Sequence, residues 1–309
     1  MELTMHRYHY KSFGLNIISE ISLPELFPKK DIFEEDTVEI KIVCDVSDFR
    51  DQLSNKKIII KKDFLLFEVP NVAIFCVKDG NKIIVDPFNG ASEGKIRLYL
   101  LGSCIGALLL QRKILPLHGS AVEINGKAYA IVGHSGAGKS TLASSFIKQG
   151  FRLISDDVIP VSFVEGTPIV KPSYPHQKLW QQSLIEFGMD YKKFNPLFER
   201  ETKYQVPVTN FVLKPIPFAG VIELDKTDGS QIQLREIYGI ERLRILLQHT
   251  YRRSFIPKLG LIDWHFKECL KVIKEIQVMQ MHRPTTPFTA NQLRELILDS
   301  INDQEEILL

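Results

Sequence analysis

The sequence is poor in several features that would point to a particular compartment or partner. Its four cysteines, Cys44, Cys76, Cys104 and Cys269, are widely separated and contain no C-x-x-C pair, so we interpret them as reduced packing residues. The net charge is only +2 over 309 residues, which gives no general reason to expect binding to nucleic acid or to an anionic membrane. These shortages argue against a disulfide scaffold and a strongly basic binding protein.

Long apolar segments are also missing. The longest uncharged run, residues 98–110, has thirteen residues, whereas a membrane-spanning helix needs about 20. Residues 1–10 lack the apolar stretch of a secretory signal. The sequence therefore predicts a cytoplasmic protein without a nucleic-acid or membrane partner, and it leaves a homo-oligomer possible.

What the sequence does contain is a glycine-rich loop. Residues 133–140 read G-x-x-x-x-G-K-S, the spacing that lets backbone N–H groups turn toward phosphate oxygens at the start of a helix. Lys139 would reach the outer phosphates, and Ser140 offers the hydroxyl that Mg²⁺ needs. The predicted nucleotide-binding residues are Gly133, His134, Ser135, Gly136, Ala137, Gly138, Lys139, Ser140 and Thr141.

The surroundings of this loop support the interpretation. Two strand-like runs, 122–124 and 129–132, flank Asn125-Gly126, a hairpin signal. The second run enters the loop directly, and a helix over 140–149 follows and ends at Gly150. This order of strand, loop and helix predicts a nucleoside triphosphate site.

Two adjacent carboxylates follow the predicted helix. Residues 151–155 read as a buried strand of roughly 17 Å, close to the length of about 15 Å expected for the preceding helix. A right-handed crossover would return the end of this strand to the loop. There Asp156 and Asp157, seventeen residues after Lys139, would divide the work of holding a metal and accepting a proton. The alternative is an Asp-Asp turn that merely ends a strand.

Three regions follow one another along the chain. Residues 1–90 contain short runs rich in β-branched and aromatic residues and predict a β-rich N-terminal domain. Residues 91–113 show the apolar spacing of a buried helix that bridges two domains. Residues 114–309 form the larger α/β domain. The expected N-terminal strands are 38–43, 57–60, 64–69, 72–77 and 82–85.

One family combines these motifs in the same order. His118-Gly, a hairpin, the loop 133–140 and Leu153-Ile-Ser-Asp-Asp together resemble the kinase domain of HPr kinase/phosphorylase. The resemblance implies an α/β P-loop kinase fold related to phosphoenolpyruvate carboxykinase, with a smaller β-rich N-terminal domain. ATP or another nucleoside triphosphate, with Mg²⁺, would be the cofactor.

The resemblance also implies roles for individual residues. Asp156 would be the base for a serine hydroxyl, Asp157 and Ser140 would serve Mg²⁺, and Lys139 would hold phosphates. His118 would support the site, although a lone histidine is more often a packing residue or a surface donor.

More of the chain is similar to a subgroup of HPr-kinase-like proteins from peptide-tailoring gene clusters. This subgroup includes kinases that phosphorylate the C-terminal serine of lasso-peptide precursors, which implies a precursor peptide as partner. The segments concerned are Phe13-Gly-Leu, Ser19-Glu, Leu23-Pro-Glu-Leu, Arg97-Leu-Tyr-Leu-Leu-Gly, Gln111-Arg, Leu115-Pro-Leu-His-Gly, Tyr174-Pro and Leu179-Trp180.

One family signature is missing. No Glu-x-Arg-Gly lies between residues 158 and 214, so the reverse, phosphorylase reaction is not expected. Arg200 and Lys203 are instead candidates for a mobile cation that neutralises charge on the transferring phosphoryl group. A solvated charged loop explains them equally well.

The sequence therefore predicts a nucleotide-dependent serine kinase acting on a peptide, in the simplest case the C-terminal serine of a lasso-type precursor. An HPr serine kinase/phosphorylase and a kinase for a small-molecule hydroxyl are the enzymatic alternatives. A nucleotide-responsive module that binds a precursor peptide without modifying it is the non-catalytic alternative, but such a binder has no need of a proton acceptor.

Overall fold

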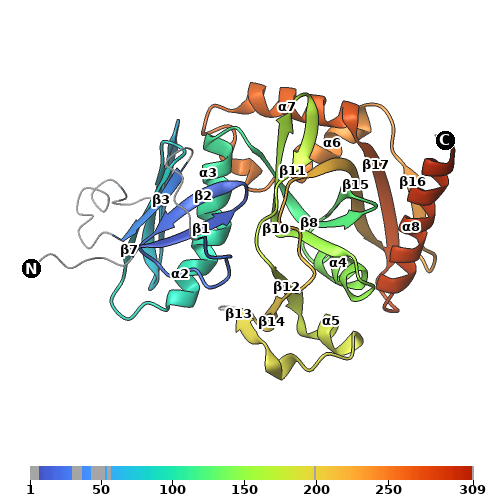
Figure 1. The fold of residues 1–309 in the computed structure, drawn as a ribbon, viewed down its shortest axis with the longest axis horizontal. Helices are drawn as coiled ribbons and strands as arrows, with labels where there is room; N and C mark the ends of the chain where they lie inside the picture. Colours follow the sequence, from blue (N-terminus) through green and yellow to red (C-terminus); the bar gives the residue numbers. More distant parts are fainter. Residues whose placement is uncertain (1–6, 30–36, 43–52, 54–56, 198–199, 308–309) are drawn as a thin grey trace, which may run out of the picture. The chain divides into compact units, whose positions relative to one another are not determined.

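A computed structural model describes residues 7–29, 37–42, 53, 57–197 and 200–307 of the chain (Figure 1). The contacts divide the chain into two compact units, each described separately below. The first unit comprises Met1–Pro116 and Thr250–Glu268, and the second comprises Leu117–His249 and Cys269–Leu309. Within the described ranges, no helix has both the length and the apolar composition needed to cross a membrane.

The first unit contains a seven-stranded sheet in the order β1-β2-β3-β7-β6-β5-β4. The pairs β2–β3 and β3–β7 are parallel, and the others are antiparallel. The five strands predicted from β-branched and aromatic runs correspond to β3 through β7. The strands are β1 (Tyr8–Ser12), β2 (Leu15–Ser19), β3 (Thr37–Ile42), β4 (Ile58–Lys61), β5 (Phe64–Val69), β6 (Ala73–Lys78) and β7 (Lys82–Pro87).

The predicted helix after this sheet is also present and belongs to the first unit. It runs through α2 (Glu93–Tyr99), a π-helical stretch (Leu100–Cys104) and α3 (Ile105–Gln111), and its middle is fully buried. The side chain of Gln111 accepts from the N–H of Gly80 at 3.0 Å and donates to the carbonyl of Val77 at 3.1 Å. The end of the helix is therefore tied to the β6–β7 hairpin.

The second unit contains another seven-stranded sheet, in the order β11-β10-β8-β9-β15-β17-β16. The central strand β15 pairs in parallel with β9 on one side and with β17 on the other, so the carboxyl ends of these three strands meet at one edge. The strands are β8 (Leu115–Ile124), β9 (Lys127–Val132), β10 (Arg152–Val164), β11 (Thr167–Val170), β15 (Ile216–Thr227), β16 (Gln233–Glu236) and β17 (Gln277–Pro284).

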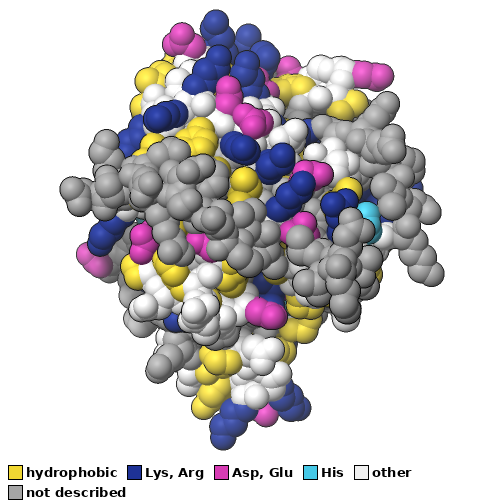
Figure 2. Space-filling model, turned by 90° about the vertical axis from the view of Figure 1, so that its left-hand side faces the viewer, with side chains coloured by type: hydrophobic (Ala, Val, Ile, Leu, Met, Phe, Trp, Pro, Cys, Tyr) yellow, Lys and Arg dark blue, Asp and Glu magenta, His cyan; other side chains and the backbone are white. Residues whose placement is uncertain are grey.

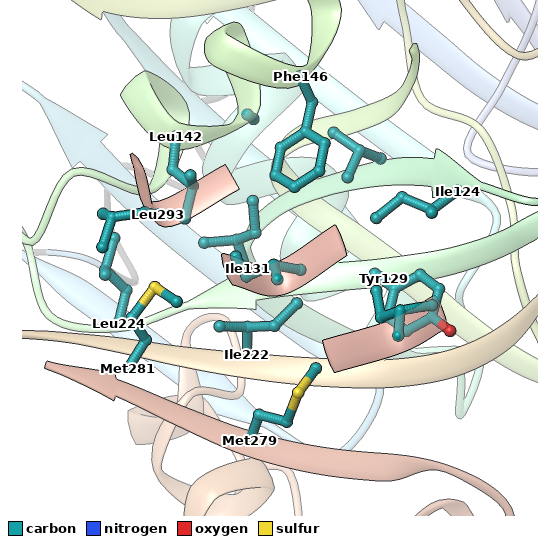
Figure 3. Close-up of a cluster of buried hydrophobic side chains, with 14 of the residues drawn as sticks. Ile124, Tyr129, Ile131, Leu142, Phe146, Ile222, Leu224, Met279, Met281 and Leu293 are labelled. Atoms are coloured by element: carbon teal, nitrogen blue, oxygen red, sulfur yellow. The ribbon is translucent and has the colours of Figure 1, made fainter. Parts of the chain in front are cut away.

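Apolar side chains join two helices to one face of this sheet. Phe146 and Leu142 project from α4 toward Ile131 of β9, Ile222 of β15 and Leu293 of α8 (Figure 3). Phe146 is fully buried. This packing fixes the start of α4 at the end of β9, where the glycine-rich loop lies. The helices with residues in this unit are α4 (Lys139–Lys148), α5 (Gln181–Glu186), α6 (Ile240–Gln248), α7 (Ile262–Glu275) and α8 (Ala290–Ile307).

The strand that carries the two aspartates differs from the prediction. The sequence predicts a strand over 151–155 with the carboxylates at its end, whereas β10 continues to Val164. Asp157 lies within it at φ 77, a conformation uncommon for a residue with a side chain. The strand is therefore distorted at Asp157 but does not end there, which the length of the segment alone does not predict.

The mixed polar and aromatic composition of residues 180–198 predicts a packed surface helix, or else a lid or docking helix, whereas the described part of this range contains only one short α-helix, α5. Most of this segment folds with its neighbours into a three-stranded sheet in the order β12-β14-β13, covered by the short helix α5. We call residues 176–207 the small-sheet module. Its strands are β12 (His176–Trp180), β13 (Asn195–Leu197) and β14 (Arg200–Pro207).

One face of the molecule is shown in Figure 2. Lys and Arg side chains gather at the top of this view, and basic, acidic and apolar side chains are intermixed below them. Three of the four cysteines, Cys76, Cys104 and Cys269, are buried, and none of these three is in a disulfide. Cys44 lies outside the described residues.

Candidate functional site

The glycine-rich loop between β9 and α4 is built around backbone conformations that favour glycine. Gly133, Gly136 and Gly138 have φ values of 146, 83 and 109. A Cβ atom on Gly133 would lie 2.3 Å from the carbonyl oxygen of Leu224, so no larger residue fits there. The loop therefore passes very close to β15 before α4 begins.

The side chain of Lys139 folds back onto the backbone of the glycine-rich loop. Its ammonium donates to the carbonyls of Gly133 at 2.9 Å and His134 at 3.1 Å. Burial lowers the pKa of Lys139, and the neighbouring Asp156 and Asp157 oppose this effect without cancelling it. Together with the first N–H groups of α4, this ammonium can hold an anion at the helix start.

Asp156 is the buried carboxylate of the pair, with 4% of its surface exposed. Its Oδ1 accepts from the hydroxyls of Ser120 at 2.5 Å and Ser140 at 3.0 Å. Its Oδ2 accepts from the backbone N–H of Lys178 at 2.8 Å. Three donors thus hold this carboxylate directly beside the first turn of α4.

Asp157 has a different set of neighbours. Its Oδ2 forms an ion pair with the ammonium of Lys178 at 2.6 Å, and its Oδ1 lies 3.5 Å from Nδ1 of His118. Burial raises the pKa of the Asp157 carboxyl, but Lys178, His118 and Lys203 more than offset this, so the pKa lies well below its usual range. Asp157 therefore stays ionised at neutral pH.

His118 lies in β8 and touches the same region as the two aspartates. Its Nδ1 is 3.1 Å from the carbonyl oxygen of Asp157, and its backbone N–H donates to the carbonyl of His249 at 2.7 Å. Burial lowers the pKa of His118 more than the nearby carboxylate of Asp157 raises it. The imidazole of His118 is therefore predominantly neutral at pH 7. In this form it can donate a hydrogen bond from one ring nitrogen and accept one at the other.

Ser140 and the second predicted metal residue are not in contact in the described geometry. The hydroxyl of Ser140 bonds to Asp156, whereas the sequence paired Ser140 with Asp157. A serine hydroxyl and one carboxylate suit Mg²⁺, which prefers oxygen ligands and usually binds through one or two carboxylates together with substrate phosphates. Among the residues that the structure describes, no group of three or more His, Cys, Asp or Glu side chains forms a self-sufficient metal cage.

The two predicted mobile cations lie in β14 of the small-sheet module. Lys203 pairs with Trp180 of β12 across the strands, and its ammonium lies over the indole ring at 5.4 Å from the centroid. The charge of Lys203 also acts on Asp157 and Lys139, although burial has the larger effect on the pKa of both. The structure thus brings Lys203 within electrostatic range of the site. Arg200 begins β14, but its side chain lies outside the described residues.

Three contributors were missed by the sequence. Ser120 lies two residues after His118, and the alternation of a strand could have suggested that both face the same side. Arg283 donates from Nε to the carbonyl of Ala137 at 2.8 Å, from the end of the parallel strand β17. Lys178 contacts both aspartates, and no local motif surrounds it.

A second polar cluster lies beside the loop. Glu223 of β15 has 1% of its surface exposed and accepts from His249 at 2.7 Å, Gln280 at 2.8 Å and Arg244 at 3.1 Å. Burial raises the pKa of Glu223, but the hydrogen bonds and charges of His249 and Arg244 outweigh burial and lower it to about 2. The ring of His249 in turn meets the loop residue His134 edge to face at 5.6 Å.

Part of the chain is similar to known proteins. Residues 111–179 match the family described as the HPr Serine kinase C-terminal domain. The chain is a distant homologue of HPr kinase/phosphorylase. Over 170 residues it is 29% identical to HPr kinase/phosphorylase from Lactobacillus gasseri, an alignment that covers 49% of this chain and 50% of that protein. It is 40% identical over 68 residues to HPr kinase/phosphorylase from Clostridium tetani, covering 21% and 22% respectively.

These similarities are partial. The chain spans about half the length of the Lactobacillus gasseri relative and about a fifth of the Clostridium tetani relative. The solved Hpr(Ser) kinase/phosphatase from Coxiella burnetii aligns with 62% of this chain and 97% of that chain, at 14% identity and a TM-score of 0.33. The residues that match the family, 111–179, contain the loop, the two aspartates and Lys178.

Proposed function

We propose that the protein is an ATP-dependent serine kinase that uses Mg²⁺. The contact between Ser140 and Asp156 at 3.0 Å carries this proposal, because it joins the glycine-rich loop to a buried carboxylate. Loop, lysine and carboxylate are the parts that phosphoryl transfer needs, since positioning and charge neutralisation supply most of the rate. The homology with HPr kinase/phosphorylase supports the same activity.

In this proposal the chain itself positions the reactants. The N–H groups at the start of α4 and the ammonium of Lys139 bind the phosphates of the nucleotide. Bound Mg²⁺ would neutralise developing charge on the phosphoryl oxygens. Ser140 and Asp156 are the residues that would hold it, because they are adjacent and offer a hydroxyl and a carboxylate.

The contacts favour a reversal of the roles first assigned to the two aspartates. Asp156 is engaged with Ser140 and is almost inaccessible, whereas the side chain of Asp157 retains 25% of its surface. Asp157 is therefore the better placed of the two to accept a hydrogen bond from an incoming hydroxyl. His118 and Lys178 keep its carboxylate in position.

For the acceptor we propose the C-terminal serine of a lasso-type precursor peptide. The support is the similarity of segments along the chain to peptide-tailoring HPr-kinase-like proteins, together with the missing Glu-x-Arg-Gly. A folded protein such as HPr is the alternative acceptor that the names of the homologues suggest.

The test is direct phosphorylation. The purified chain is incubated with ATP, Mg²⁺ and a peptide ending in serine, and mass spectrometry measures the gain of one phosphoryl group. Lys139→Met should abolish the gain, whereas Lys258→Met, which removes an exposed ammonium from the first unit, should not. Transfer by Lys139→Met at the unmodified rate would reject the site, and transfer to HPr but not to the peptide would reject the acceptor.

A further inference from the structure

The small-sheet module presents two different faces. In the antiparallel pair β12–β14, Trp180 stands opposite Lys203, and Leu179 stands opposite Tyr204. Leu179 and Tyr204 are buried in the apolar cluster of the module. Because side chains alternate along a strand, Lys178, Trp180 and Lys203 share the other face.

One end of this face touches the candidate site. The ammonium of Lys178 lies 2.6 Å from Oδ2 of Asp157, and its backbone N–H lies 2.8 Å from Oδ2 of Asp156. Trp180 is two residues further along β12, a distance of about 7 Å along a strand. The face is thus anchored at the two carboxylates and continues outward from them.

The outer part of the face is an unusual combination for a solvent-exposed strand pair. Trp180 is 40% exposed, although a large aromatic side chain loses free energy by remaining in water. The ammonium of Lys203 stacks on its ring at 5.4 Å. An aromatic surface next to a cation suits a ligand that has an apolar group and a negative charge close together.

We propose that Lys178, Trp180 and Lys203 form the acceptor subsite, and that Lys203 binds the terminal carboxylate of the acceptor peptide while Trp180 contacts the preceding apolar side chain. This inference rests on the proposed peptide kinase function and adds the chemical feature by which the acceptor is recognised. It also gives Lys203 a role different from that of a mobile cation on the transferring phosphoryl group. A cation on the phosphoryl group would act on every acceptor alike, whereas a carboxylate receptor discriminates between them.

The experiment measures binding without chemistry. Two probes are used, acetyl-Ala-Gly-Leu-Phe-Ser with a free C-terminal carboxylate and the same peptide as its C-terminal amide. Isothermal titration calorimetry in the absence of nucleotide gives Kd for both. The unmodified protein should bind the carboxylate form at least tenfold more tightly, because a charge-assisted contact is lost in the amide.

Variants then assign the preference to residues. Lys203→Met should reduce the preference for the carboxylate to about onefold, whereas Lys193→Met, which removes an exposed ammonium from the same module, should keep it. Trp180→Ala should weaken the binding of both peptides by about the same factor, and Trp180→Phe should retain most of the affinity of the unmodified protein. Circular dichroism verifies that each variant is folded.

Several results would overturn the proposal. Equal binding of the two peptides by the unmodified protein would do so, as would a carboxylate preference that survives Lys203→Met, or no binding of either peptide. These outcomes are separate from the fate of the kinase itself. Suppose that Lys203→Met removes the preference for the carboxylate but the unmodified protein does not transfer phosphate from ATP. The peptide subsite would then be retained and the kinase function rejected.

Discussion

Single strands of the two seven-stranded sheets of this protein bury very different side chains. In the first unit, β6 buries Ala73–Val77, a run of purely apolar residues. In the second unit, β10 and β15 bury Asp156 and Glu223, each held by three hydrogen-bond donors. Both sheets have the same number of strands, so strand number does not explain the difference.

The comparison indicates what each sheet contributes. A buried carboxylate is tolerated only when donors compensate for its lost hydration, and it adds little net stability. An apolar strand such as β6 stabilises the fold through the area that it removes from water. We infer that β6 serves stability, and that β10 and β15 give up some stability to keep charged groups beside the glycine-rich loop. The first sheet is not wholly apolar, because it also buries Asp86 of β7.

The largest expected effect on stability comes from a substitution in the buried apolar strand β6. Phe75→Ala removes a fully buried ring and should lower the free energy of unfolding by about 3–5 kcal/mol. Chemical denaturation measures the loss. Ile262→Ala, at a position that is 58% exposed, should change stability by less than about 0.5 kcal/mol. A similar decrease in the free energy of unfolding of both variants would contradict the inference that burial of apolar side chains stabilises this unit.

The next effect concerns the two aspartates and therefore chemistry rather than folding. Asp156→Asn and Asp157→Asn should each lower kcat by about a thousandfold, a typical value for a group that handles a proton or orients a nucleophile. Only Asp156→Asn should also raise the Mg²⁺ concentration needed for half-maximal rate. Steady-state rates over a Mg²⁺ series decide this, and a shift with Asp157→Asn instead would restore the original division of roles.

The smallest expected effect concerns Glu223, the buried carboxylate next to the loop. Its pKa is lowered from 4.5 to about 2 in the folded protein. The ionised Glu223 carboxylate therefore stabilises the folded protein fully above about pH 4.5, and this stabilisation is lost as the pH falls through the pKa of the folded state. Glu223→Gln should cost about 2 kcal/mol at pH 7, and the difference from the unmodified protein should shrink by pH 3. Unfolding curves at both pH values test it, and a difference independent of pH would contradict the assignment.

Local signals predicted the parts of the fold that depend on neighbouring residues. The hairpin pairs Asp79-Gly80 and Asn125-Gly126 adopt positive φ values at both positions, as the turn type requires. The helix after the glycine-rich loop, α4, ends at Lys148, and Gly150 follows its C-cap with φ 95, as a capping glycine does. These features follow from two to ten consecutive residues, so no tertiary contact is needed to foresee them.

The small-sheet module was not foreseen, because its stability is not local. Its strand β12 pairs with β14, and the register joins Trp180 to Lys203 across an intervening helix. Residues 181–186 do form a short helix, so a helical interpretation was partly reasonable. The sheet itself depends on an apolar cluster that includes Leu179, Leu184 and Tyr204, which is assembled only on folding.

By itself, the sequence determined which chemical groups are available: a glycine-rich loop ending in Lys139 and Ser140, two adjacent aspartates and a histidine upstream. The tertiary structure decided which of these groups meet. Ser140 contacts Asp156 rather than Asp157, while Lys178 contacts both. The physical reason is that spacing along a chain fixes the order of side chains and the faces of single elements, whereas strand order, local bends such as that at Asp157 and the packing of α4 fix the distances between them.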